Sequence, residues 1–117
     1  ISYGKLSISD SIKIATIQME ELYKFLNSKN ISLSVVVYPS PAQLAFDREM
    51  SKQVKIWKKF CHSRCKHFIN TFPYFFEKMN EASFEQVNDE YYIKNDVHFN
   101  KEGNLAIANL IISQLKK

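Results

Sequence analysis

Ile31-Ser32-Leu33-Ser34-Val35-Val36-Val37-Tyr38 is the stretch that decides the fold class. It is rich in β-branched residues and becomes continuously apolar toward its end, which predicts a strand buried on both faces of a parallel sheet. A helix should precede it, because one apolar stripe recurs at spacings of three and four: Ile12, Ala15, Met19, Leu22, Tyr23 and Leu26. We expect Ser9 or Ser11 to cap this helix and residues 27–30 to end it. A helix followed by a buried strand is half of a βαβ unit, so the predicted fold class is α/β.

The segment that follows the strand, Tyr38-Pro39-Ser40-Pro41-Ala42-Gln43, is the first candidate for ligand binding. Open α/β sheets bind their ligands at the carboxyl ends of the strands, and the two prolines make this loop stiff. Tyr38, Ser40 and Gln43 are therefore the predicted substrate-binding residues. Ser40 is expected to be a loop hydroxyl and not a nucleophile, because the sequence predicts neither a glycine elbow nor a helix start beside it. Gln43 is either a hydrogen-bond donor of a pocket or a solvated side chain.

The rest of the chain alternates helical and strand patterns. Residues 44–66 read as a helical region in which Asp47 or Ser51 caps a second segment, and residues 67–72 read as a strand stopped by Pro73. Residues 77–90 predict a short helix and a loop. The last predicted helix spans residues 105–115, with an amphipathic stripe formed by Leu105, Ala108, Ile111, Ile112 and Leu115. The whole chain, residues 1–117, has the length of one domain.

Two cysteines stand four residues apart in the helical region, Cys61 and Cys65, with His62 and His67 nearby. This arrangement matches no standard zinc spacing, so no metal site is predicted. A disulfide stays open as an alternative. On a continuous helix, however, unpaired and partly buried thiols are the expected state.

Charge and hydropathy predict neither a nucleic-acid-binding surface nor a membrane span in this chain. The net charge is +4, and its densest group of cations, Lys52, Lys55, Lys58 and Lys59, has the helical spacing of a solvated face. No nucleic-acid-binding motif accompanies these lysines. No apolar run approaches the roughly 20 residues that a membrane-spanning helix needs.

A second stretch carries the candidate chemistry: Asp96-Val97-His98-Phe99-Asn100-Lys101-Glu102-Gly103-Asn104. Asp96 and His98 lie at i and i+2, and in an extended segment this spacing points both side chains to the same side. A carboxylate that orients an imidazole is the acid–base half of a nucleophilic triad, so Asp96 and His98 are the candidate catalytic residues. Asn100 is expected to cap the following helix. A turn-capping aspartate beside a packed or solvated histidine remains the alternative interpretation.

Residues 91–104, followed by Ala106 and Ala108, resemble the last conserved block of the SGNH (GDSL-type) hydrolases. The strand followed by Pro-x-Pro-x-Gln is similar to the same family. The usual spacing in that block is Asp-x-x-His, whereas this chain has Asp-x-His; Asn95 fits the usual spacing but supplies an amide, so Asp96 is preferred. The resemblance implies the C-terminal portion of a flavodoxin-like three-layer sandwich with a mainly parallel sheet. It also implies a Ser-His-Asp triad without a cofactor, an ester substrate such as a carbohydrate O-acetyl group, and an extracytoplasmic location in the bacterial periplasm or at the cell surface.

The family's first block, Gly-Asp-Ser with its nucleophilic serine, is not in this sequence. Neither of the two glycines, Gly4 and Gly103, fits it. We therefore expect residues 1–117 to be part of a domain whose missing N-terminal half carries the serine, and we expect the isolated chain to be inactive. The alternative is a non-catalytic α/β module that binds a carbohydrate or a protein through an aromatic surface made by Trp57, Tyr74, Phe75 and Tyr92.

Overall fold

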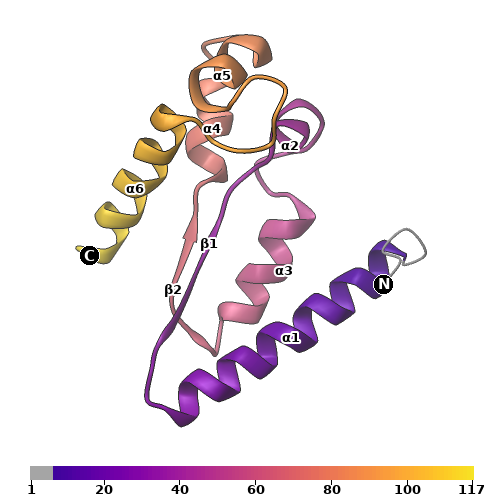
Figure 1. The fold of residues 1–117 in the computed structure, drawn as a ribbon, viewed down its shortest axis with the longest axis vertical. Helices are drawn as coiled ribbons and strands as arrows, with labels where there is room; N and C mark the ends of the chain where they lie inside the picture. Colours follow the sequence, from indigo (N-terminus) through magenta and orange to yellow (C-terminus); the bar gives the residue numbers. More distant parts are fainter. Residues whose placement is uncertain (1–6) are drawn as a thin grey trace.

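The computed structural model describes residues 7–117, so Gly4 lies outside the described residues. Within them the chain is a mixed α/β structure with six helices and one two-stranded parallel sheet (Figure 1). The elements are, in order, α1 (Ile8–Ser28), β1 (Leu33–Val37), α2 (Pro41–Phe46), α3 (Lys52–Cys61), β2 (Cys65–Asn70), α4 (Phe72–Lys78), α5 (Phe84–Tyr91) and α6 (Lys101–Leu115). The predicted α/β class is confirmed at this level.

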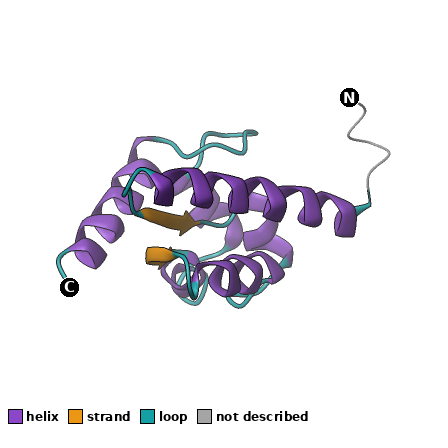
Figure 2. Cartoon of the chain, turned by 90° about the horizontal axis from the view of Figure 1, so that it is seen from below, coloured by secondary structure: helices purple, strands orange, loops and turns teal. Residues whose placement is uncertain are grey.

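The two strands form the centre of the structure. They pair in parallel from Leu33 opposite Cys65 to Val37 opposite Asn70. Beyond their ends, the backbone N–H and the hydroxyl of Thr71 both donate to the carbonyl oxygen of Val37, at 3.0 and 2.8 Å. Helix α3 connects the strands and packs on both of them, and Figure 2 shows the strand pair with α1 along one side and α3 along the other. The carboxyl ends of both strands are therefore fixed side by side.

Burial of β1 on both faces was predicted and is wrong for most of the strand. Only Val37 is buried, and the residues before it are partly buried or exposed. The reason is that α3 packs on β1, whereas α1 lies loosely against the rest of the chain and has no buried residue, so the strand is only partly covered.

Serine side chains set the starts of several helices. Ser7 caps α1 by accepting from the N–H of Asp10, so this helix starts earlier than the sequence predicted. Ser51 caps α3, as predicted, whereas Asp47 ends α2 and caps no helix start. Helix α2 itself begins at Pro41, directly after Ser40, and the prediction that no helix starts beside Ser40 was wrong. Proline is well suited to a first helical turn, where its missing N–H has no intrahelical partner.

The region around Pro73 also differs from the prediction. Strand β2 ends at Asn70, and Phe72 already begins α4, with Pro73 in its first turn. The proline therefore starts a helix as well as ending a strand. The aromatic run that follows lies in this helix, and Phe72 and Phe75 have no solvent exposure.

Helix α6 presents a different face to the protein than predicted. It starts at Lys101, four residues earlier than expected, and packs through Gly103 and Ala106. Most of the predicted stripe faces solvent, since Leu105, Ala108, Ile112 and Leu115 are exposed and only Ile111 is partly buried. Small residues at the contact allow α6 to approach α5 closely, and most large residues of the predicted stripe are left on the outside.

Helix α1 lies loosely against the rest of the chain. None of its residues is buried, although the predicted stripe, apart from the exposed Leu22, is partly covered. Its outer side also carries large exposed apolar residues, namely Ile14, Ile17 and Phe25. No helix in the described part of the chain, α1 included, combines the length and apolar character needed to cross a membrane.

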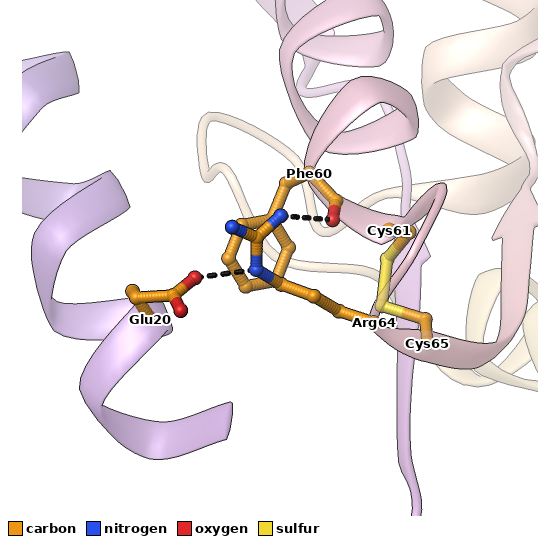
Figure 3. Close-up of a disulfide and its surroundings, with 5 residues drawn as sticks. All are labelled: Glu20, Phe60, Cys61, Arg64 and Cys65. Atoms are coloured by element: carbon orange, nitrogen blue, oxygen red, sulfur yellow. Dashed lines mark hydrogen bonds and ion pairs between the residues drawn. A yellow bond between two sulfur atoms is a disulfide. The ribbon is translucent and has the colours of Figure 1, made fainter. Parts of the chain in front are cut away.

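The two cysteines form a disulfide, and the expectation of unpaired thiols was wrong (Figure 3). Cys61 is the last residue of α3 and Cys65 the first of β2, so the pair does not lie on one helix. A tight turn brings their Cα atoms to 4.6 Å. Inside this turn Arg64 forms an ion pair with Glu20 of α1 and donates to the carbonyl oxygen of Phe60 at 3.1 Å. The disulfide therefore closes the corner at which α1 is held.

Candidate functional site

The loop that carries Asp96 and His98 is closed by backbone pairing at its base. Tyr92 and Phe99 form an antiparallel bridge, and the N–H of Ile93 donates to the carbonyl of His98 at 3.0 Å. The ring of Phe99 stacks on the ring of Tyr92, with centroids 4.8 Å apart. Tyr92 is buried and its hydroxyl donates to the carbonyl of Pro39, which follows β1. The loop is thus tied to the carboxyl end of the sheet.

Asp96 and His98 form a direct contact. His98 Nδ1 lies 2.6 Å from Asp96 Oδ1, and the same oxygen accepts the backbone N–H groups of Val97 and His98 at 2.6 and 3.2 Å. The pair arises from this turn and not from the extended strand end that the sequence suggested. Asn95 has a left-handed backbone, with φ of 59°, and Asp96 is the carboxylate that meets the imidazole.

These hydrogen bonds determine the protonation of the pair. The bond from His98, followed by the two backbone N–H groups, lowers the pKa of Asp96 below its ordinary value of 3.8. An ionised carboxylate can only accept hydrogen bonds, so the proton between the two side chains belongs to His98 Nδ1. In the neutral imidazole Nε2 then carries the free lone pair, which is the tautomer a general base needs.

Asn100 and Gly103 join this loop to α6. Asn100 is the N-cap, as predicted, and its side-chain oxygen accepts the N–H of Gly103 at 2.9 Å. Gly103 lies so close to the end of α5 that a Cβ atom there would stand 2.1 Å from the carbonyl oxygen of Tyr91. Only a glycine fits at position 103, and this allows α6 to begin at Lys101, two residues after Phe99.

A cleft of about 700 Å³ opens at the carboxyl end of β1, and His98 lies on its rim. The structure brings the predicted substrate-binding residues and the predicted base to this one cleft, although Asp96 is not part of its wall. The imidazole is well exposed, with 76% of the His98 side chain accessible against 42% for Asp96. The lining residues are Val36, Tyr38, Ser40, Gln43, Gln53, Val97, His98, Phe99 and Asn104.

Two of the predicted cleft residues also have structural roles. Ser40 and Gln43 form a capping box: Ser40 Oγ accepts the N–H of Gln43 at 3.2 Å, and Gln43 Oε1 accepts the N–H of Ser40 at 2.9 Å. The Ser-x-x-Gln spacing is a readable signal for such a box. Gln43 Nε2 donates to Gln53 Oε1 at 2.6 Å, so Gln43 acts as a donor, but toward another side chain.

Two cleft residues were missed by the sequence analysis. Gln53 comes from α3 and stands in no pattern that indicates a site, whereas Asn104 of α6 ends the stretch that carries Asp96 and His98 but was not singled out. Gln53 reaches the cleft because α3 crosses beside β1, which depends on tertiary packing.

Two of the four residues expected to form an aromatic binding surface, Phe75 and Tyr92, do not lie at the surface. Phe75 and Tyr92 are 0% and 2% exposed and belong to the apolar core.

Comparison of the chain with protein-family models, with curated proteins and with solved structures found no match.

Proposed function

We propose that this chain supplies the acid–base half of a Ser-His-Asp site that cleaves or transfers an ester, in the manner of the SGNH hydrolases. The observation that carries the proposal is the 2.6 Å contact between Asp96 and His98 Nδ1 on the rim of a cleft. The cleft stands at the carboxyl end of a parallel strand, which is where α/β sheets place their ligands. The fit of residues 91–104 to the family's last block gives independent support from the sequence.

The chemistry follows from the tautomer of His98. Its Nε2 accepts the proton of a hydroxyl while that oxygen forms a bond to the ester carbonyl carbon. The tetrahedral intermediate then expels the alcohol, which takes the proton back from Nε2 as the carbon–oxygen ester bond breaks. Water resolves the acyl group in a hydrolase and a second alcohol resolves it in a transferase. Asp96 stabilises the imidazolium in both half-reactions.

We propose that the attacking hydroxyl belongs to the N-terminal half of a flavodoxin-like sandwich, encoded before Ile1. Two observations support this arrangement. One edge of β1 has no partner strand among residues 7–117, and two strands are fewer than the roughly four to six that sheets usually contain. The outer sides of α1 and α6 also carry exposed large apolar residues, which additional sheet and helices would cover.

We also propose that the domain folds outside the cytoplasm. The disulfide between Cys61 and Cys65 supports this, because such bonds persist in oxidising compartments and are rare in the cytosol. A small-molecule or carbohydrate ester is the proposed substrate.

The test is a hydrolysis assay on p-nitrophenyl acetate with two polypeptides, residues 1–117 and the product of the reading frame extended upstream. We expect no saturable turnover from the first and saturable turnover from the second. In the extended protein His98→Ala should abolish turnover, and Asp96→Asn should lower kcat by about four orders of magnitude. His62→Ala removes an exposed histidine away from the cleft and serves as the control.

Equal activity of the extended protein and its His98→Ala variant would remove the basis for the catalytic proposal. A reading frame that starts at Ile1 would remove the proposed source of the hydroxyl. Either result would leave a non-catalytic binding module as the better account of the cleft.

A further inference from the structure

We infer that Gln53 is a substrate-positioning hydrogen-bond donor of the cleft and that it binds an uncharged oxygen acceptor such as an ester carbonyl. This inference rests on the proposed function, because it concerns the same cleft. It adds a residue, a direction of hydrogen bonding and a ligand class.

A chain of hydrogen bonds fixes which end of the Gln53 amide is left without a partner. The backbone N–H of Ser40 can only donate, so the atom of Gln43 that faces it must be the oxygen Oε1. Gln43 Nε2 must then face Gln53, and the atom that accepts its hydrogen bond must be Gln53 Oε1. The orientation of both amides therefore follows from a backbone group whose polarity is certain.

The amide nitrogen of Gln53 is left as the free end of this chain. Among the described residues no acceptor is hydrogen-bonded to Gln53 Nε2, and Gln53 lines the cleft together with His98. A donor that lines a cleft without a protein partner is matched by an acceptor on a ligand or by water. Gln53, which carries this unpaired donor, and the proposed base therefore line the same cleft.

The backbone that carries Gln53 is well fixed, as a substrate-positioning residue requires. It stands in the first turn of α3, between Ser51, which caps the helix and is buried, and Val54, which has no solvent exposure. Ser51 Oγ accepts the N–H of Val54 at 3.2 Å. A side chain on a buried helix start, held at one end by a second side chain, loses little further freedom when it binds a ligand.

The residues that line the cleft indicate which class of ligand it binds. No lysine, arginine, aspartate or glutamate lines the cleft, so its wall carries no carboxylate, ammonium or guanidinium group to pair with an ionic ligand. Besides His98, its polar side chains carry amides and hydroxyls. The half-exposed ring of Tyr38 provides an apolar surface, and its centroid lies 5.1 Å from that of the Phe99 ring. A neutral molecule with an acceptor oxygen and an apolar part fits this lining better than an ion does.

The test is a titration of the isotope-labelled protein with triacetin, a neutral triester, followed by nitrogen–proton correlation NMR. The side-chain amide signals of Gln53 should shift with the same saturation curve as the ring signals of His98. Gln53→Glu keeps the oxygen that accepts from Gln43 and removes the donor, so it should weaken binding by about tenfold or more. Gln86→Glu adds the same charge in the capping box of α5, away from the cleft, and should leave the affinity unchanged.

The outcomes separate this inference from the proposed function. Unshifted Gln53 signals at the solubility limit of triacetin, or equal affinities of the wild type and Gln53→Glu, would overturn the inference while the roles of Asp96 and His98 stood. Binding that depends on Gln53, combined with an extended protein that stays fully active after His98→Ala, would sustain the donor and remove the catalytic proposal.

Discussion

Helix α1 and the segment from α4 to the start of α6 are both rich in apolar residues, yet the chain buries them very differently. The 21 residues of α1 include no buried side chain. In the second segment Phe75, Val87, Tyr91 and Tyr92 form an apolar core with Ala106. Amphipathic periodicity alone does not distinguish the two, because it reports which face is apolar and not what covers it. The difference shows which part of the chain holds the candidate site in place.

The largest expected effect is a difference in the free energy of unfolding when one phenylalanine in each of the two regions is replaced by alanine. Phe75 has no exposure, and its ring lies within 5.5 Å of the rings of Tyr91 and Phe99. Phe75→Ala should lower the free energy of unfolding by about 3–5 kcal/mol, because it leaves a cavity under the site loop. The control is Phe25→Ala in α1, where the side chain is 59% exposed and the loss should stay below about 0.5 kcal/mol.

Denaturant unfolding of the two variants measures this difference directly. Equal losses would mean that α1 is as strongly packed as the core, contrary to its burial. A small loss for both would mean that the aromatic core does not stabilise the fold.

A smaller effect is expected where α6 meets α5. Gly103→Ala places a methyl group 2.1 Å from the carbonyl oxygen of Tyr91, so the start of α6 must move. We expect a loss of about 1–3 kcal/mol in denaturant unfolding, and a weaker cap at Asn100. Asn104→Ala, one residue further along the exposed side of the same helix, is the matched control and should change stability little. A neutral Gly103→Ala would show that the approach of the two helices is not tight.

The next effect concerns the bond that ties the site loop to β1. Tyr92→Phe leaves the buried carbonyl of Pro39 without the Tyr92 hydroxyl and should cost about 1–2 kcal/mol. Tyr38→Phe, at a half-exposed ring in the same region, is the control. An equal stability of the wild type and Tyr92→Phe in denaturant unfolding would mean that this bond does not hold the loop.

The same tyrosine predicts an alkaline limit of stability. Burial, followed by the charge on Tyr38, raises the pKa of Tyr92 above its ordinary value of 10.0. Below pH 10 the hydroxyl is protonated in both states, so its contribution is complete. Above pH 10 the unfolded chain loses a proton that the folded chain keeps, and stability falls as pH rises. Unfolding followed against pH should show this fall, and it should be smaller in Tyr92→Phe.

Part of the fold could be predicted from the sequence alone. The strand at residues 33–37, the cap at Ser51 and the cap at Asn100 follow from local chemistry, and local patterns predicted them. The exposed stripe of α6 could not be predicted, because Gly103 and Ala106 make the contact and their small size gives no hydrophobic signal. The disulfide was kept only as an alternative because the end of α3 at Cys61 has no proline or glycine to mark it.

The candidate site also contains residues that the sequence predicted and residues that it did not. Asp96, His98, Tyr38, Ser40 and Gln43 follow two recognisable sequence patterns, and the structure brings His98 and the last three residues to one cleft. Gln53 enters the site from a helix whose sequence indicates only packing and solvation. Local patterns thus identified the residues on loops, whereas the residue on α3 required the tertiary arrangement.

The smallest effect on stability, and the most informative one for function, is expected at the exposed pair itself. Asp96→Asn should leave the unfolding transition nearly unchanged, because both side chains are solvent-accessible and held by a local turn. The tautomer of His98 should change, since an amide no longer requires a proton on Nδ1. Ring nitrogen shifts in NMR measure this: Nε2 should be the bare nitrogen in the wild type, and a mixture of tautomers should appear in Asp96→Asn.

The acid titration of the wild type sharpens the same point. The hydrogen bonds to Asp96 keep its pKa below 3.8, so the carboxylate stays ionised and the interaction that they make is present throughout the neutral range. It is lost only as pH falls through that lowered pKa. A carboxyl titration of Asp96 above 3.8, or a wild-type His98 with its proton on Nε2, would mean that the turn does not prepare the imidazole. The buried core beneath the loop would then position a histidine without making it a base.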